Sequence, residues 1–181
     1  MKLVVLTGSP HRMGSTSLLA DHFVKGAEAA GHEVFRFDAA FEEVHPCIAC
    51  DKCQQGRNAC IFADGMAKLN PHLLEADAVA FASPLYYYGL NAQLKAVIDR
   101  FYGNDTALRK YPKKAFLLMA AADDEPDTFA GAVRNYKKMI DYLKWRNCGK
   151  VLAFGCSVRA DLTETDYPEQ AYCLGRRLAE F

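Results

Sequence analysis

The stretch that decides the fold runs from residue 2 to residue 27 and reads KLVVLT, then GSPHRMG, then STSLLADHFVKGA. The first part is an apolar, β-rich run, and the second is a turn bounded by two glycines. From about Thr16 onward, apolar residues recur at three- and four-residue spacing, as they do along one face of a helix. A strand that passes through such a turn directly into a helix predicts the opening unit of a parallel α/β sheet.

The same alternation continues along the chain. Further strands are expected at residues 33–38, 78–82, 114–120 and 149–156, and further helices at 66–75, 92–101, from 127 or 128 to about 146, and 167–180. The strands read as continuous apolar runs, which is typical of a parallel sheet with helices on both faces. We therefore predict one α/β domain over residues 1–181 with a doubly wound, five-stranded parallel sheet. Ligands of such sheets lie beyond the carboxyl ends of the strands.

The composition narrows the possible partners. Lys plus Arg and Asp plus Glu both number 22, so the formal net charge is zero and gives no reason to expect nucleic acid or an anionic membrane. No secretory leader is visible and no run approaches the ~18 apolar residues of a membrane span, so we expect a soluble, cytoplasmic protein. In that compartment the seven cysteines are expected to be thiols, redox groups or metal ligands rather than disulfides.

The turn after the first strand has the composition of a phosphate-binding loop. Its glycines permit tight turns, and the start of the next helix offers free N–H groups and the positive end of the helix dipole. Hydroxyl donors and positive charges come from Ser9, His11, Arg12, Ser15, Thr16 and Ser17. The spacing is not that of a dinucleotide-binding loop or a nucleotide hydrolase, and it suits a terminal monophosphate. The alternative is an ordinary turn in which Ser15 caps the helix.

The turn after the third strand offers a surface for a flat ring. It reads SPLYYYGLN over residues 83–91, with three consecutive tyrosines at the expected ligand edge of the sheet. Tyrosine rings can pack against a planar heterocycle, and backbone N–H groups of the turn can bind its polar edge. The alternative is that the tyrosines only cover the edge of the sheet.

Together the two turns resemble the NADPH-dependent FMN reductase and iron–sulfur flavoprotein branch of the flavodoxin-like superfamily. The matching segments are GSPH at 8–11, GST at 14–16, SPLYY at 83–87, QLK at 93–95 and IDR at 98–100. The resemblance implies a flavodoxin-like sheet of strand order 2-1-3-4-5 and non-covalently bound FMN. It implies NAD(P)H as hydride donor, a small-molecule or protein electron acceptor, and a homodimer or homotetramer.

The resemblance also implies which residues bind FMN. The phosphate is expected on Ser9, His11, Ser15, Thr16 and Ser17, and the isoalloxazine against Pro84, Leu85, Tyr86, Tyr87 and Gly89. The turn after the fourth strand, at Ala122 and Asp123, is expected on the other side of the ring. The flavin carries the redox chemistry, so no side chain is named as an obligatory catalytic residue.

A cysteine-rich loop of about residues 42–63 interrupts the alternation after the second strand. Its cysteines are spaced Cys47-x2-Cys50-x2-Cys53-x6-Cys60. Iron–sulfur flavoproteins resemble this pattern, which implies a 4Fe–4S cluster on these four thiolates. A four-cysteine zinc site and uncoordinated, redox-sensitive thiols are the alternatives.

Three functions therefore remain open. The first is an NAD(P)H-dependent flavin or quinone reductase, and the second is an iron–sulfur electron-transfer module. The third is a flavin or metal sensor without turnover. Consumption of NAD(P)H separates the first from the others, and iron with labile sulfide identifies the second.

Overall fold

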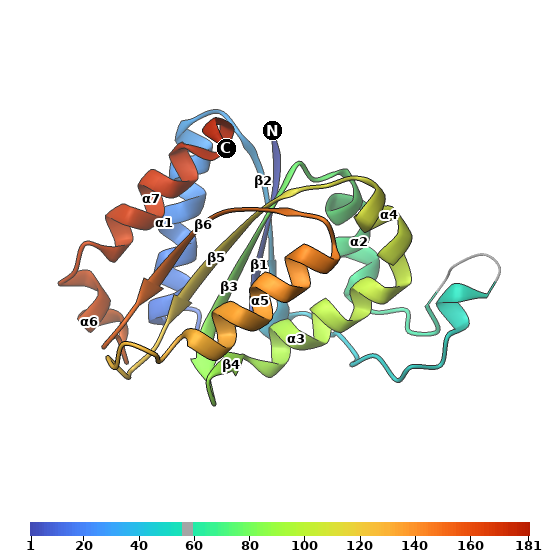
Figure 1. Cartoon of the computed structure of the whole chain (residues 1–181), viewed down its shortest axis with the longest axis horizontal. Helices are drawn as coiled ribbons and strands as arrows, with labels where there is room; N and C mark the ends of the chain where they lie inside the picture. The colour runs from blue at the N-terminus through green and yellow to red at the C-terminus, as the bar shows by residue number, and fades with distance from the viewer. Residues whose placement is uncertain (56–59) are drawn as a thin grey trace.

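The computed structural model describes residues 1–55 and 60–181, and its centre is a twisted sheet (Figure 1). The strands are β1 (Lys2–Thr7), β2 (Glu33–Asp38), β3 (Ala78–Tyr86), β4 (Gly89–Leu90), β5 (Lys114–Ala120) and β6 (Arg146–Ala153). The five long strands are parallel in the order β2-β1-β3-β5-β6, and the short β4 pairs antiparallel with the end of β3. This confirms the predicted flavodoxin-like class and strand order.

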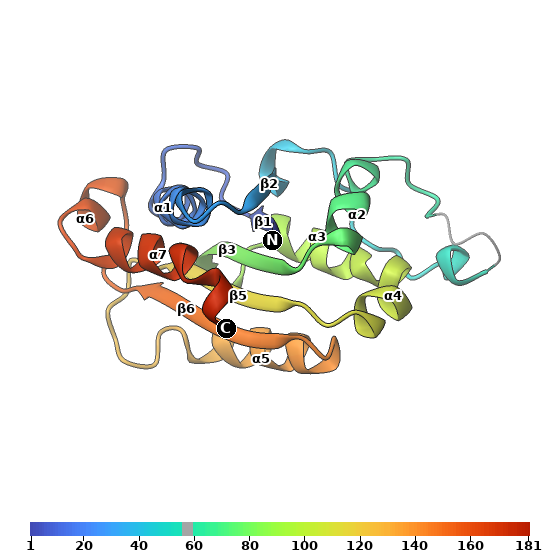
Figure 2. The same ribbon diagram turned by 90° about the horizontal axis from the view of Figure 1, so that it is seen from above.

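Helices cover both faces of the sheet (Figure 2). They are α1 (Ser15–Ala29), α2 (Met66–Glu75), α3 (Ala92–Asp99), α4 (Asp105–Lys110), α5 (Ala130–Tyr142), α6 (Arg159–Thr163) and α7 (Tyr167–Arg176). Short 3₁₀ helices occur at Ala39–Phe41, Lys52–Gln54, Arg100–Asn104 and Leu178–Glu180.

Two apolar cores lie on the two faces because successive side chains of a strand point to opposite sides. In β1, Leu3 and Val5 belong to the core beneath α1, α6 and α7. Val4 and Leu6 belong to the core beneath α2, α3, α4 and α5. All four side chains are at most 2% exposed, which explains why β1 reads as a continuous apolar run.

The last part of the chain departs from the prediction. The helix α5 is shorter than the expected 127–146, and β6 starts at Arg146 rather than at residue 149. Lys144 adopts a left-handed conformation (φ 60°), and the N–H of Trp145 bonds to the carbonyl of Ile140 at 2.8 Å. This is a Schellman-type helix end, in which the left-handed position is usually a glycine. Here lysine occupies the position, so the sequence carried no stop signal.

Other boundaries also differ from the prediction. The strand β3 continues through Pro84 to Tyr86, pairing Pro84 with Ala120 of β5, although the sequence predicted its end at residue 82. The expected helix 167–180 is divided into α7 and the 3₁₀ turn at Leu178–Glu180. The short elements β4, α4 and α6 were not predicted because each has fewer residues than a periodic pattern needs.

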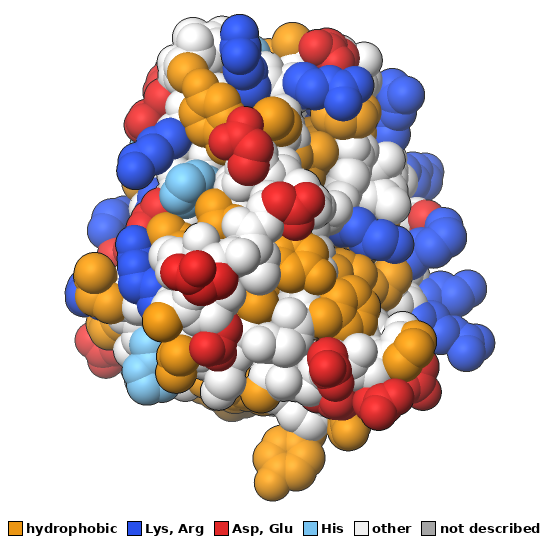
Figure 3. Space-filling model, turned by 90° about the vertical axis from the view of Figure 1, so that its left-hand side faces the viewer, with side chains coloured by type: hydrophobic (Ala, Val, Ile, Leu, Met, Phe, Trp, Pro, Cys, Tyr) orange, Lys and Arg blue, Asp and Glu red, His pale blue; other side chains and the backbone are white. Residues whose placement is uncertain are grey.

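The surface carries charges of both signs. Figure 3, which views the side of the molecule with α6 and α7, shows acidic and basic side chains with hydrophobic ones between them. Among the described residues, no helix has both the length and the apolar composition needed to cross a membrane.

The helices α1 and α7 pack together very closely. A Cβ atom built on Gly26 of α1 would lie 2.0 Å from the carbonyl oxygen of Tyr172 in α7. Real Cβ atoms do not approach this closely, so only glycine permits the contact. The contact holds α1, which begins at the turn after β1, against α7.

We predict that Gly26→Ala destabilises the protein. In an exposed helix this change would gain about 1 kcal/mol of helix propensity, but here the clash with the Tyr172 carbonyl should cost about 1–3 kcal/mol in the free energy of unfolding. Urea denaturation measures the difference. Gly89→Ala is the control, because its Cβ would meet only the carbonyl of Tyr86, at 3.8 Å. An unchanged or more stable Gly26→Ala variant would contradict the packing.

Candidate functional site

A cavity of about 230 Å³ lies at the carboxyl ends of the parallel strands. It is bordered by the turn after β1, the end of β3 and the turns after β5 and β6. The lining residues are Ser9, His11, Gly14, Ser15, Thr16, Pro84, Leu85, Tyr86, Ala120, Ala121, Ala122, Cys156 and Ser157. We call this the strand-end cavity. It brings together the two turns that the sequence singled out, which lie about 70 residues apart in the chain.

The turn after β1 is folded around the carbonyl of His11. The hydroxyl of Ser17 donates to this carbonyl at 2.8 Å, and the N–H of Gly14 donates to it at 3.0 Å. The N–H of His11 bonds to the hydroxyl oxygen of Ser9 at 3.2 Å. The hydroxyl of Ser15 is buried and has no hydrogen-bond partner within the described part of the chain. A buried hydroxyl without a partner is costly, so one that lines a cavity indicates a ligand contact.

The two possible cations of this turn have different surroundings. His11 lines the strand-end cavity. The guanidinium of Arg12 stacks on the ring of Phe41, with 3.7 Å between its central carbon and the ring centroid. Arg12 therefore holds the turn against the segment that leads to the cysteine loop.

The buried side chain of Asn91, at the N-cap of α3, joins the two turns. Its amide nitrogen donates to the carbonyl of Gly8, and its carbonyl oxygen lies 3.1 Å from the hydroxyl of Ser83. Its backbone N–H donates to the same hydroxyl at 3.0 Å. A Cβ atom on Gly8 would lie 1.9 Å from the Asn91 oxygen, so the glycine is required by this close approach.

The tyrosine turn between β3 and β4 is tightly wound. Tyr87 and Tyr88 both have positive φ, at 46° and 60°. Left-handed backbone costs about 1 kcal/mol or more at non-glycine residues and concentrates at functional sites. Tyr86 borders the strand-end cavity, while Tyr87 is fully exposed, at 102%. A second hollow next to this turn is lined by Leu85, Tyr87, Tyr88, Ala121, Ala122 and Asp123.

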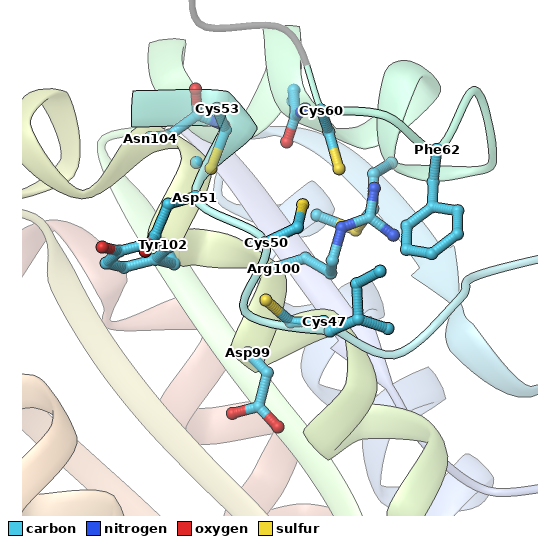
Figure 4. Close-up of a pocket in the computed structure, with 14 residues that line it drawn as sticks. Cys47, Cys50, Asp51, Cys53, Cys60, Phe62, Asp99, Arg100, Tyr102 and Asn104 are labelled. Carbon is cyan, nitrogen blue, oxygen red and sulfur yellow. The ribbon is translucent and has the colours of Figure 1, made fainter. Parts of the chain in front are cut away.

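A separate cavity of about 50 Å³ lies in the cysteine loop. Its lining includes Cys47, Cys50, Cys53 and Cys60, together with Arg100 and Tyr102. Figure 4 shows the four sulfur atoms directed into the same hollow. Cys47, Cys50 and Cys60 are exposed and Cys53 is half-buried. Within the described residues, no three His, Cys, Asp or Glu side chains are arranged to hold a metal ion.

The backbone between these cysteines is also tightly wound. Ala49 and Asp51 have positive φ, at 54° and 55°. Gln54 anchors the tip of the loop, since its amide nitrogen donates to the carbonyl of Tyr102 at 2.8 Å. The loop is thus held against the 3₁₀ helix Arg100–Asn104 that follows α3.

A model of the NADPH-dependent FMN reductase family matches residues 1–155. The chain belongs to this family. It is an oxidoreductase of a family of FMN-binding reductases, as its sequence resemblance predicted.

Curated relatives of this FMN reductase family member carry the name iron–sulfur flavoprotein. One from Archaeoglobus fulgidus is 30% identical over 183 residues, covering 99% of this chain and 80% of the relative. One from Methanocaldococcus jannaschii is 33% identical over 100 residues, covering 55% of this chain and 51% of the relative. The alignment with the latter thus spans about half the length of that relative.

A solved structure shares the fold of this FMN reductase family member. The NAD(P)H:quinone oxidoreductase from Methanothermobacter marburgensis matches with a TM-score of 0.77 and 20% sequence identity, covering 97% of this chain and 94% of that one. At this identity the likeness establishes the flavodoxin-like fold alone.

The structure brings most of the predicted flavin-site residues to one place. Ser9, His11, Ser15, Thr16, Pro84, Leu85, Tyr86 and Ala122 line the strand-end cavity. Tyr87 and Asp123 line the neighbouring hollow, while Ser17 and Gly89 are among the lining residues of neither. Sequence reasoning missed Cys156 and Ser157, because the last strand was expected to continue through residue 156. Their only sequence signal was their position just after the fifth long strand, where parallel sheets place ligands.

Arg100 connects the two ends of the cysteine loop, at His45 and Asp64, which we call the neck of the loop. Its guanidinium forms a two-pronged ion pair with Asp64, at 2.6 and 3.2 Å, and donates to the carbonyl of His45 at 2.8 Å. Asp64 also accepts the N–H of His45 at 3.0 Å. His45 precedes Cys47 and Asp64 follows Cys60, so this buried pair closes the loop at its base. Sequence reasoning had used Arg100 only as part of a family motif.

The ion pair shifts the pKa values of both partners. Burial disfavours the charged carboxylate of Asp64, but the bonds from Arg100 and from the N–H groups of His45 and Met66 outweigh burial and hold the pKa of Asp64 below its usual range. Burial likewise opposes the charged form of Arg100, but its interactions with Asp64 and Cys60 raise its pKa above the ordinary value. Both groups are therefore charged at neutral pH.

We predict that Asp64→Asn destabilises the protein near neutral pH by about 3–5 kcal/mol in the free energy of unfolding, because it leaves a buried guanidinium unpaired. The pKa of Asp64 is lower in the folded chain than in the unfolded chain. Its contribution is therefore complete above the unfolded value of about 4 and is lost as the pH falls below it.

Urea denaturation between pH 3 and pH 7 measures this effect. The difference between the wild type and Asp64→Asn should shrink below about pH 4. Asp141→Asn is the control, because its pair with Lys137 at 3.1 Å is exposed and should contribute nothing measurable. A difference that stays constant over this pH range would contradict the assignment.

Proposed function

We propose that this protein is an iron–sulfur flavoprotein that binds FMN in the strand-end cavity and a 4Fe–4S cluster on Cys47, Cys50, Cys53 and Cys60. The observation that carries the proposal is that four thiols line one cavity whose neck is closed by a buried ion pair. Iron–sulfur clusters are held by four cysteine thiolates, and this cavity is lined by four cysteines. The names of the curated relatives support the same assignment.

The strand-end cavity offers suitable groups for each end of FMN. Ser15 and the N-terminus of α1 would receive the phosphate, together with Ser9, His11 and Thr16, while Ser17 holds the turn in shape. Pro84, Leu85, Tyr86, Tyr87 and Gly89 would border one side of the isoalloxazine, and Ala122 and Asp123 the other. Cys156 and Ser157 extend this set.

Bound FMN supplies the chemistry of accepting a hydride from NAD(P)H and releasing electrons one at a time. The chain contributes binding and orientation. Asn91 holds the turn after β1 and the tyrosine turn at a fixed separation, and the second hollow, lined in part by Tyr87, would receive the nicotinamide. The acceptor is a small molecule or an electron-transfer protein, and we propose a homodimer or homotetramer of single-domain chains.

The second candidate is a NAD(P)H-dependent flavin or quinone reductase with uncoordinated thiols. One observation favours it: Cys47, Cys50 and Cys60 are exposed and so accessible to oxidants. A zinc site would require the four sulfurs to meet around one ion at about 2.3 Å.

We predict that protein purified without oxygen contains flavin and about four iron and four sulfide per chain. Absorption spectroscopy with iron and sulfide analysis measures this content. Cys50→Ser should lose the iron and keep the flavin. Cys173→Ser is the matched control, because Cys173 is an exposed cysteine on α7, outside the loop.

Flavin without iron, persisting after anaerobic reconstitution with iron and sulfide, would contradict the cluster and leave the second candidate. Oxidation of NADPH or NADH by the flavin-loaded protein tests the nicotinamide assignment separately. Failure to bind flavin would contradict the strand-end cavity as the FMN site.

We predict that Ser15→Ala weakens FMN binding about 10- to 100-fold, because a hydrogen bond to a charged phosphate is lost. Binding of riboflavin, which lacks the phosphate, should change little. Ser17→Ala serves as the comparison, since its hydroxyl already donates to the carbonyl of His11. Fluorescence titration of the wild type and both variants with FMN and with riboflavin measures the affinities. Equal losses for FMN and riboflavin in Ser15→Ala would contradict a phosphate contact.

A further inference from the structure

We propose that Arg100 raises the reduction potential of the cluster by holding its charge and its N–H donors against Cys60. The inference rests on the proposed 4Fe–4S cluster and goes beyond it, since Arg100 is not a ligand. It assigns to Arg100 a positioning and tuning role within the cysteine cavity.

Arg100 occupies a fixed place beside the thiols. The residue is only 6% exposed and lines the cysteine cavity. Figure 4 shows its guanidinium between the side chains of Cys60 and Phe62. The ring of Phe62 covers it, with 5.3 Å from the guanidinium carbon to the ring centroid. A charge that is both buried and held in place acts more strongly on its neighbours than a mobile surface charge.

The guanidinium of Arg100 has N–H donors that its bonds to the loop do not use. A guanidinium has about five N–H donors in a rigid fork. Bonds to the two oxygens of Asp64 and to the carbonyl of His45 use three of them. Beyond these, Arg100 lines the same cavity as Cys60, and Figure 4 shows the guanidinium beside this cysteine. About two N–H donors of the guanidinium are therefore left in the cavity that the cysteines line.

The expected direction of the effect follows from charge. Four thiolates make an iron–sulfur site negative, and reduction adds another electron to it. Hydrogen bonds to the sulfurs and nearby positive charge favour the reduced form and raise the potential. The negative charge of Asp64, paired with the guanidinium at 2.6 Å, offsets part of this effect.

The two partners should therefore shift the potential in opposite directions. Arg100→Gln removes the positive charge and should lower the equilibrium constant for one-electron reduction at least tenfold, which is about 59 mV. Asp64→Asn leaves the Arg100 charge uncompensated and should raise the same constant. If Arg100 and Asp64 only held the loop in shape, both variants should lose the cluster, and the two reduction potentials should not shift in opposite directions.

The experiment is an anaerobic redox titration of the cluster-loaded protein, followed by electron paramagnetic resonance. Variants are compared with the wild type at equal iron content. Arg177→Gln is the control, because Arg177 is an exposed cation at the end of α7, paired with Glu180 at 2.6 Å and outside the lining of the cysteine cavity. Its potential should match the wild type, since exposed charges are screened by solvent and salt. Equal potentials in the wild type and Arg100→Gln would overturn the inference.

A second measurement takes its main result from the wild-type protein, so that result does not depend on a variant that could fail to fold. Wild-type protein labelled with ¹⁵N-arginine should show a ¹⁵N hyperfine coupling to the reduced cluster, and the coupling should disappear in Arg100→Lys. Among the described residues, Arg100 is the arginine that lines the cysteine cavity. Absence of the coupling in the wild type would overturn the inference.

The two proposals fail in different ways. Wild-type protein without iron after reconstitution would overturn the cluster and the role of Arg100 together. The wild type could instead hold an intact cluster whose reduction potential is the same in Arg100→Gln and whose spectrum lacks the ¹⁵N coupling. That result would overturn only the role of Arg100.

Discussion

The strand-end cavity depends on the buried amide of Asn91. This side chain bonds to the carbonyl of Gly8 and to the hydroxyl of Ser83, and so ties the end of β1 to the end of β3. A buried amide without partners would cost more than its bonds return, so the two turns are stable only when they are held together. The missing Cβ of Gly8 leaves the space that the amide occupies. The geometry of both turns follows from this contact.

The helix α3 connects this cavity to the cysteine loop. Asn91 is the N-cap of α3, and Arg100 follows directly after its last residue, Asp99. Eight helical residues span about 12 Å, so one rigid element holds the anchors of both sites at a fixed separation. One anchor is a neutral amide network and the other a buried ion pair. The strand-end cavity is therefore built into the sheet edge, whereas the cysteine cavity is held against α3 and the 3₁₀ helix after it by side-chain bonds of Arg100 and Gln54.

The sequence predicted more of the strand-end cavity than of the cysteine loop. The turn after β1 and the tyrosine turn after β3 are each one short segment, so their composition can be read directly from the sequence. Both border the same cavity because parallel strands end at one edge of the sheet. The spacing of the four cysteines predicted a common site for them, but it did not predict which side chains surround that site. Arg100 and Asp64 lie 36 residues apart in the chain, and no local pattern pairs them.

The sequence by itself determined the alternation of strands and helices, the doubly wound class and the two ligand-side turns, because these depend on local periodicity and on residues with special backbone freedom. The tertiary structure decided which cation borders the cavity, since Arg12 stacks on Phe41 while His11 is among the lining residues. It also decided the end of α5 at Lys144, the added strand β4, and the placement of Cys156 and Ser157 beside the other turns. Each of these depends on contacts between residues distant in the chain or on a strained conformation held by its surroundings, and neither is encoded in a short stretch of sequence.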